Sequence, residues 1–164
     1  MTLLSSLTAT FCDYYLEGFS TRQEIQQSDT RLVEWAESRW LVLSSLLFGL
    51  PAIYGFQKGV IAHSVLLLAT SGVSAGYWVC AKHSWRRNAD LCLAKTSAVI
   101  FFVSGIYHIR TAYAVVFYTG AAGFMYAYSL SATHYRRNPV WVFYHFVFHM
   151  CIALETLLVI NHVY

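Results

Sequence analysis

Five long apolar stretches, separated only by short polar segments, dominate this sequence. They cover roughly residues 40–57, 59–81, 91–109, 111–132 and 140–163. Each is close to the length of about 20 residues that a helix needs to cross the hydrocarbon core of a bilayer. Backbone groups in lipid must form their hydrogen bonds within their own segment, so helices are the expected structure. We therefore expect an all-α, polytopic membrane protein with about five transmembrane helices.

The composition agrees with a lipid environment. Hydrophobic residues make up 57% of the chain and charged residues 12%, which is about half the charged share of a soluble globular domain. Too few polar side chains remain to cover a water-soluble particle. The net charge of +3 is spread over short loops and forms no long basic run with interleaved aromatic residues, so no nucleic-acid partner is expected.

Residues 1–39 form a polar N-terminal arm, which leaves 40–164 as the transmembrane helical domain. The arm carries six of the eight carboxylates of the chain. Within it, Thr21 is followed three residues later by Glu24, the spacing of a capping box at a helix start. The second half of the arm has apolar and aromatic residues that suit an interfacial helix lying at the membrane surface: Leu32, Val33, Trp35, Ala36 and Trp40.

Lysine and arginine are distributed unevenly between the two sides of the predicted bundle. Nine of the 11 lie in the arm, the second-to-third loop and the fourth-to-fifth loop, whereas the opposite side has only Lys58 and Arg110. Basic loops tend to stay on the inner side of a membrane, so the N-terminus is expected inside and the C-terminus outside. Four loop arginines are candidates for contact with the head groups of anionic phospholipids: Arg86, Arg87, Arg136 and Arg137.

The predicted topology sorts the histidines by depth. His145 and His149 are four residues apart on one helix, which places both imidazoles on the same face, about 6 Å apart along the axis. His83, at the inner end of the second stretch, is a candidate third ligand. Three histidines with one open position are typical of a catalytic zinc site. Asp90, which opens the third stretch, is a candidate to orient a histidine or take a proton.

At these residues the chain resembles the CREST superfamily of membrane hydrolases and receptors, which includes alkaline ceramidases, progestin and adiponectin receptors and GPI-lipid remodelling hydrolases. The resemblance implies zinc bound by His83, His145 and His149, with Asp90 beside it. It also implies a lipid amide or ester as substrate. The family has about seven spans and a serine one turn before its first histidine, where this sequence has Val79.

Other roles for these histidines remain open. An imidazole near a helix end can anchor the protein at the level of the lipid head groups, as Trp and Tyr do. His145 and His149 could equally contact a neighbouring subunit or a lipid phosphate. Histidines that face one another from two helices could ligate haem, although the spacing singles out no such pair.

Glu155 lies deep in the last stretch and is predicted to be turned away from the face of His145, at about 100° per residue. An ionisable group inside the membrane is costly unless it is paired, so Glu155 is a candidate functional residue. Its candidate partners are His63, His108 or a group on another protein.

Two functions follow from these patterns. The first is a small accessory subunit of a larger membrane complex, such as a respiratory or photosynthetic assembly, with a structural and lipid-binding role in an organelle inner membrane, the mitochondrial one being favoured. The acidic arm would be repelled by an anionic membrane surface, which favours a basic protein partner. The second is a zinc-dependent lipid amidase or esterase of CREST type, which favours the endoplasmic reticulum. Whether the chain is an enzyme therefore stays open.

Overall fold

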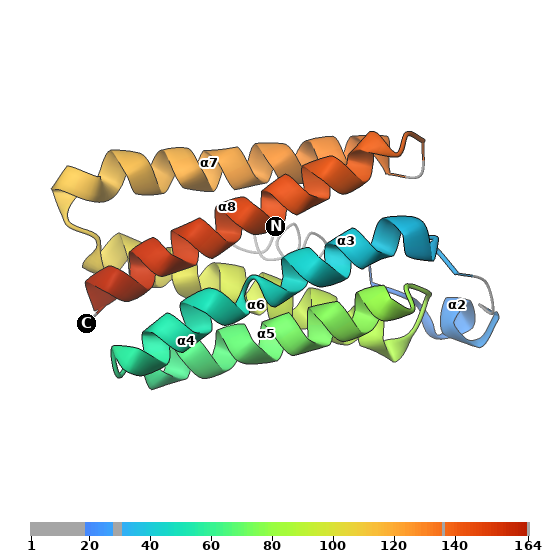
Figure 1. Cartoon of the computed structure of the whole chain (residues 1–164), viewed down its shortest axis with the longest axis horizontal. Coiled ribbons are helices and arrows are strands. Elements are labelled where there is room, and N and C mark those ends of the chain that lie inside the picture. The colour runs from blue at the N-terminus through green and yellow to red at the C-terminus, as the bar shows by residue number, and fades with distance from the viewer. Residues whose placement is uncertain (1–18, 28–30, 136, 164) are drawn as a thin grey trace, which may run out of the picture.

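The computed structural model describes residues 19–27, 31–135 and 137–163, and the regular structure in this part of the chain is all helical. It comprises seven helices (Figure 1): α2 (Arg22–Gln27), α3 (Trp35–Leu46), α4 (Gly49–Gln57), α5 (Ile61–Val79), α6 (Trp85–His108), α7 (Thr111–His134) and α8 (Val140–Val163). The loops after α5 and α7 mark one end of the bundle, called the arm end below because the N-terminal arm docks there. The short turns after α4 and α6 mark the far end.

The first apolar stretch forms two helices, α3 and α4, which are separated at Leu47 and Phe48. Pro51 lies in the first turn of α4, and proline has no backbone N–H to donate to the carbonyl four residues before it. The Leu47 carbonyl instead accepts a hydrogen bond from the N–H of Leu50 at 3.1 Å. Proline chemistry therefore accounts for the break in this helix.

Two very short turns join helices at the far end. In the turn between α4 and α5, Gly59 has a φ of 74°, a conformation that glycine adopts without steric cost. Ile109 and Arg110 form the turn between α6 and α7. The helices α4 and α5 pack closely side by side, as expected for so short a turn, but α6 and α7 do not.

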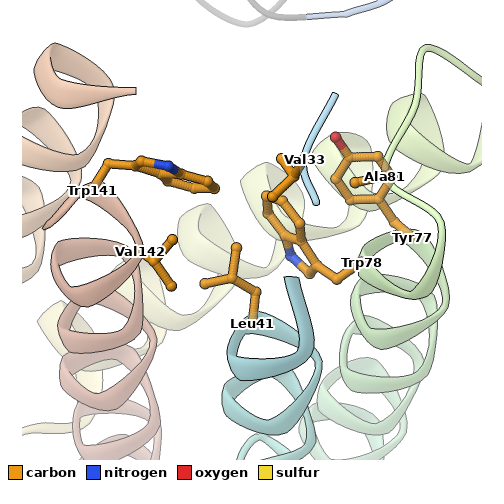
Figure 2. Packing of buried hydrophobic residues seen from close by; sticks show 7 residues of the cluster. All are labelled: Val33, Leu41, Tyr77, Trp78, Ala81, Trp141 and Val142. Atoms are coloured by element: carbon orange, nitrogen blue, oxygen red, sulfur yellow. The ribbon is translucent and has the colours of Figure 1, made fainter. Parts of the chain in front are cut away.

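The packing of the long helices is uneven. The most extensive contact is between α7 and α8, while α3 and α4 pack against α5 and α8, and α6 packs against α5 and α8. Figure 1 shows α7 set apart from α6, with α8 crossing in front of them. One buried cluster lies at the arm end and joins α3, α5 and α8 (Figure 2): Val33, Leu41, Tyr77, Trp78, Ala81, Trp141 and Val142. A second cluster lies toward the far end: Ala52, Val60, Leu67, Phe101, Phe117, Val159 and Ile160.

Three helical segments of the described chain are long and apolar enough to cross a membrane, by length and composition: Trp35–Gln57, which spans α3 and α4, Trp85–His108 and Val140–Val163. These segments are compatible with an integral membrane protein. The helices α5 and α7 coincide with two further predicted spans but do not meet the same criterion. Large apolar side chains on the outer surface, such as Leu50 and Val115, are 61% and 72% exposed.

The arm docks on the bundle through its described residues. The backbone N–H of Thr21 donates to Glu24 Oε2 at 2.7 Å, and the N–H of Glu24 donates back to Thr21 Oγ1 at 3.2 Å, so the predicted capping box at the start of α2 is confirmed. The Asn88 side chain forms two hydrogen bonds with the backbone of Ser20. It accepts one from the Ser20 N–H at 2.7 Å and donates one to the Ser20 carbonyl at 2.9 Å. The arm is thus fixed to the start of α6.

Candidate functional site

A cavity of about 400 Å³ lies among α5, α6, α7 and α8. Most of its wall is apolar and aromatic, with Phe101, Phe117, Phe124, Phe148 and Ile152 among the lining residues. Its polar lining residues come mainly from the arm end: Ser74, Tyr77, Arg87, Asp90, Lys95, Ser131, Tyr135, His145 and His149. The cavity therefore has an amphipathic lining, with most of its polar groups toward the arm end and a mainly apolar far half that also contains Glu155 and Thr156.

Asp90 is buried in the first turns of α6 and lines the cavity. Its carboxyl group is hydrogen-bonded to Ser74 of α5, and the Ser74 hydroxyl is also 3.0 Å from the Ser45 hydroxyl of α3. One helical turn further along, Thr70 and Ser97 join α5 and α6 by a hydrogen bond of 2.8 Å. Paired polar groups are the expected way to hold such side chains inside a bundle.

His145 and His149 face the same cavity, and their ring centroids are 4.7 Å apart. The Nδ1 of His149 is 2.8 Å from the Ser44 hydroxyl, which also donates to the Leu41 carbonyl at 3.1 Å. Since a serine hydroxyl has one proton, this assigns the proton to His149 Nδ1 and leaves Nε2 as an acceptor. The Nδ1 of His145 is 3.1 Å from the Ser131 hydroxyl.

His83 is held by the arm. Its Nδ1 is 2.9 Å from the Ser20 hydroxyl and 2.9 Å from an Nη of Arg87. The rings of Trp78 and Phe148 pack against His145, with centroid distances of 5.2 and 5.4 Å. Among the described residues, no three His, Cys, Asp or Glu side chains form a group that could hold a metal ion. The residues present therefore do not fit a three-histidine centre, and zinc binding stays a prediction.

The arginines predicted at lipid head groups occupy different environments. Arg86 is exposed, with its guanidinium 5.8 Å from the ring of Trp85. Arg87 is half-buried, bonds to Ser20 at 3.2 Å and lines the cavity. Arg137 is exposed in the loop before α8. Arg136 lies outside the described residues.

Glu155 lies at the contact between α7 and α8. Its carboxyl group packs against Gly120, where any larger residue would collide with it. Its Oε2 is buried without a hydrogen-bond partner among the described residues. His63, one of its predicted partners, instead bonds to Ser104 at 2.9 Å. Glu155 was predicted to face away from His145, yet both side chains line this broad cavity.

The hydroxyl partners of the histidines and of Asp90 were not predicted from the sequence. Ser44 is 105 residues from His149 along the chain, so only the folded bundle brings the two together. The sequence offers one local sign of a polar helix face: Ser71 and Ser74 are three residues apart and so share one side of the helix. Both are buried in the structure. Comparison with family models, with curated proteins and with solved structures finds no match for this chain.

Proposed function

We propose that this chain is a membrane protein with five spanning helices that binds an amphipathic lipid in the cavity among α5, α6, α7 and α8. The amphipathic lining of that cavity is the observation that carries the proposal. Binding sites for small molecules are typically concave and mostly apolar, with a few polar groups that fix the orientation of the ligand. A lipid with its polar group at the arm end and its chain toward the far end matches this lining.

The hydrogen bonds of α5 support its assignment as a membrane-spanning helix, although its mean hydropathy is too low to meet the criterion that the three other segments meet. Ser71 donates to the carbonyl of Ser45 at 2.9 Å, and Thr70 and Ser74 bond to groups on α6 and α3. Lipid would not have to solvate these hydroxyls, because neighbouring helices satisfy them. We place α7 across the membrane as well, because it runs antiparallel to α8 along its length (Figure 1).

Native mass spectrometry of the protein released from gentle detergent tests lipid binding. We expect wild type to retain a lipid-sized adduct. Ala121 lines the cavity, whereas the adjacent Ala122 does not and is exposed. Ala121→Phe should fill the cavity and reduce the adduct, and Ala122→Phe is the matched control. An adduct equally abundant in both variants would contradict binding in this cavity.

We further propose that the arm end faces the inner side of an organelle membrane, and we favour the mitochondrial inner membrane. In that membrane the chain works as an accessory subunit of a larger complex. The basic residues Lys82, Arg86, Arg87 and Arg137 at that end support this orientation. A tag at the N-terminus should then be protected on the side opposite the C-terminus. Native gels should show the chain in a complex far above its 18.6 kDa mass, and a monodisperse monomer would contradict the subunit role.

A zinc-dependent lipid hydrolase is the second candidate, because Asp90, His145 and His149 line the same cavity. This candidate requires a metal ligand set beyond the histidine pair. About one equivalent of bound zinc, lost in His145→Ala and His149→Ala together with activity on a lipid amide or ester, would replace the first proposal. Zinc-free protein that retains its lipid adduct would exclude this candidate.

A further inference from the structure

Glu155 lies between two cavities. It lines the interior cavity among α5, α6, α7 and α8, and it also lines a second cavity of about 440 Å³ formed by α4, α7 and α8. The other residues that line the second cavity lie toward the far end: Tyr54, Val116, Leu154, Leu157, Leu158 and Asn161. Within the described part of the chain, Glu155 alone lines both cavities. Its side chain therefore lies where the two cavities approach each other.

The second cavity has polar groups between Glu155 and the far end of the bundle. Asn161 is exposed near the end of α8, about 9 Å along the axis from Glu155, since an α-helix rises about 1.5 Å per residue. Its Oδ1 accepts a hydrogen bond from the hydroxyl of Tyr54 on α4 at 2.8 Å. Hydrogen-bonding groups are therefore present along the path from the Glu155 carboxyl to the face of the membrane expected at the far end.

The surroundings of the Glu155 carboxyl group lack a compensating charge. The carboxyl packs against Gly120 of α7, and its Oε2 is buried without a hydrogen-bond partner among the described residues. The residues that line the second cavity include no Lys, Arg or His, and Tyr54 is its other titratable group. On α8 itself, Cys151 lies one turn before Glu155. Besides tyrosines, the titratable groups of the interior cavity lie in the arm-end halves of α6 and α8: Arg87, Asp90, Lys95, His145 and His149.

An unpaired carboxylate buried inside a bundle is costly, and binding a proton removes this cost. We propose that Glu155 is a reversible proton-binding site, which exchanges its proton with water at the far end through the cavity among α4, α7 and α8. Proton uptake forms one O–H bond on the carboxyl group, and release returns the proton to water at the same face. The site is thus served from one side of the membrane, whether or not a lipid occupies the interior cavity.

Infrared spectroscopy of the full chain in vesicles of one orientation tests the inference. A protonated carboxyl group has a C=O stretching band distinct from the bands of a carboxylate, and Glu155→Gln identifies the band of Glu155. We expect the wild-type band to be absent from Glu155→Gln and to weaken when the pH is raised on the far-end side, where α8 ends. Raising the pH on the arm side alone should leave the band unchanged. A Glu155 band that is absent at every pH, that responds to neither side, or that responds equally to the arm side overturns the inference.

Filling the second cavity tests the route of the proton. Val116 lines this cavity, whereas the adjacent Val115 does not and is 72% exposed. After a rise in the far-end pH, Val116→Phe should slow the loss of the Glu155 band about tenfold, which corresponds to about 1.4 kcal/mol in the barrier. Val115→Phe is the matched control and should keep the wild-type rate, with circular dichroism confirming that both variants are folded. Equal rates in the two folded variants overturn the far-end route. None of these measurements depends on a lipid adduct, so the proposed function can fail independently.

Discussion

The contact between Gly105 of α6 and Phe117 of α7 at the far end predicts the effect of adding one methyl group. Gly105 is buried in α6, and a β-carbon there would collide with the ring of Phe117, which is 3% exposed. Overpacking of this kind costs about 1–3 kcal/mol, while replacing a helical glycine by alanine returns about 1 kcal/mol. Gly105→Ala should therefore lower the free energy of unfolding by up to about 2 kcal/mol.

Gly123→Ala is the matched control, because a β-carbon at Gly123 meets nothing within 4 Å. This variant should gain up to about 1 kcal/mol, so the two alanine variants should differ by about 1–3 kcal/mol, the overpacking term alone. Unfolding by sodium dodecyl sulfate in mixed micelles, followed by tryptophan fluorescence, measures both. In a Phe117→Val background the difference should disappear. Equal stability of Gly105→Ala and Gly123→Ala in the native background would refute the assigned contact between α6 and α7.

Three further predictions concern the polar groups. Ser44→Ala leaves a buried imidazole without its partner and should cost about 1–3 kcal/mol in the same unfolding assay, whereas Ser129→Ala, which removes an exposed bond within one helix, should change little. Trp78→His adds an imidazole beside the histidine pair and should raise zinc retained after desalting above the wild-type level; unchanged zinc would contradict the assigned geometry. The backbone and side-chain hydrogen bonds from Thr21 lower the pKa of Glu24 below its usual 4.5, so the cap is present above that value and is lost as pH falls through the lowered one. Thr21→Val should raise this pKa toward 4.5 in an NMR titration.

The lengths of the last two helices were predicted closely, because apolar stretches with polar ends have few competing interpretations. The stretch 140–163 coincides with α8, and 111–132 nearly coincides with α7. The start of α6 was missed by several residues, because Arg86 and Arg87 made that segment resemble a loop. Ser84 is the N-cap of α6 and accepts a hydrogen bond from the Arg87 N–H at 3.4 Å, which places both arginines in the first turn of the helix.

The site was predicted only where its residues share one helix. The spacing of His145 and His149 determines their proximity, because residues four apart stack on one face. His83 lies in a loop, where depth in the membrane says nothing about the direction of the side chain. The direction of the His83 ring is fixed by Ser20 of the arm and Arg87 of α6, which both bond to it. The sequence gives no sign that Trp78 occupies the place beside the histidine pair.

The distribution of polarity supports the membrane setting and also explains why the cavity escaped prediction. Hydroxyl and charged groups such as Ser44, Ser74 and Asp90 are buried, while Leu50 and Val115 are largely exposed, the reverse of what water selects. In a bilayer the polar groups of a bundle pair with one another and the apolar groups face lipid. Hydropathy along the sequence measures the sum of these two faces and cannot separate them. The polar interior therefore lowers the apparent hydropathy of α5, although its hydroxyls hold α3, α5 and α6 together and form one wall of the cavity.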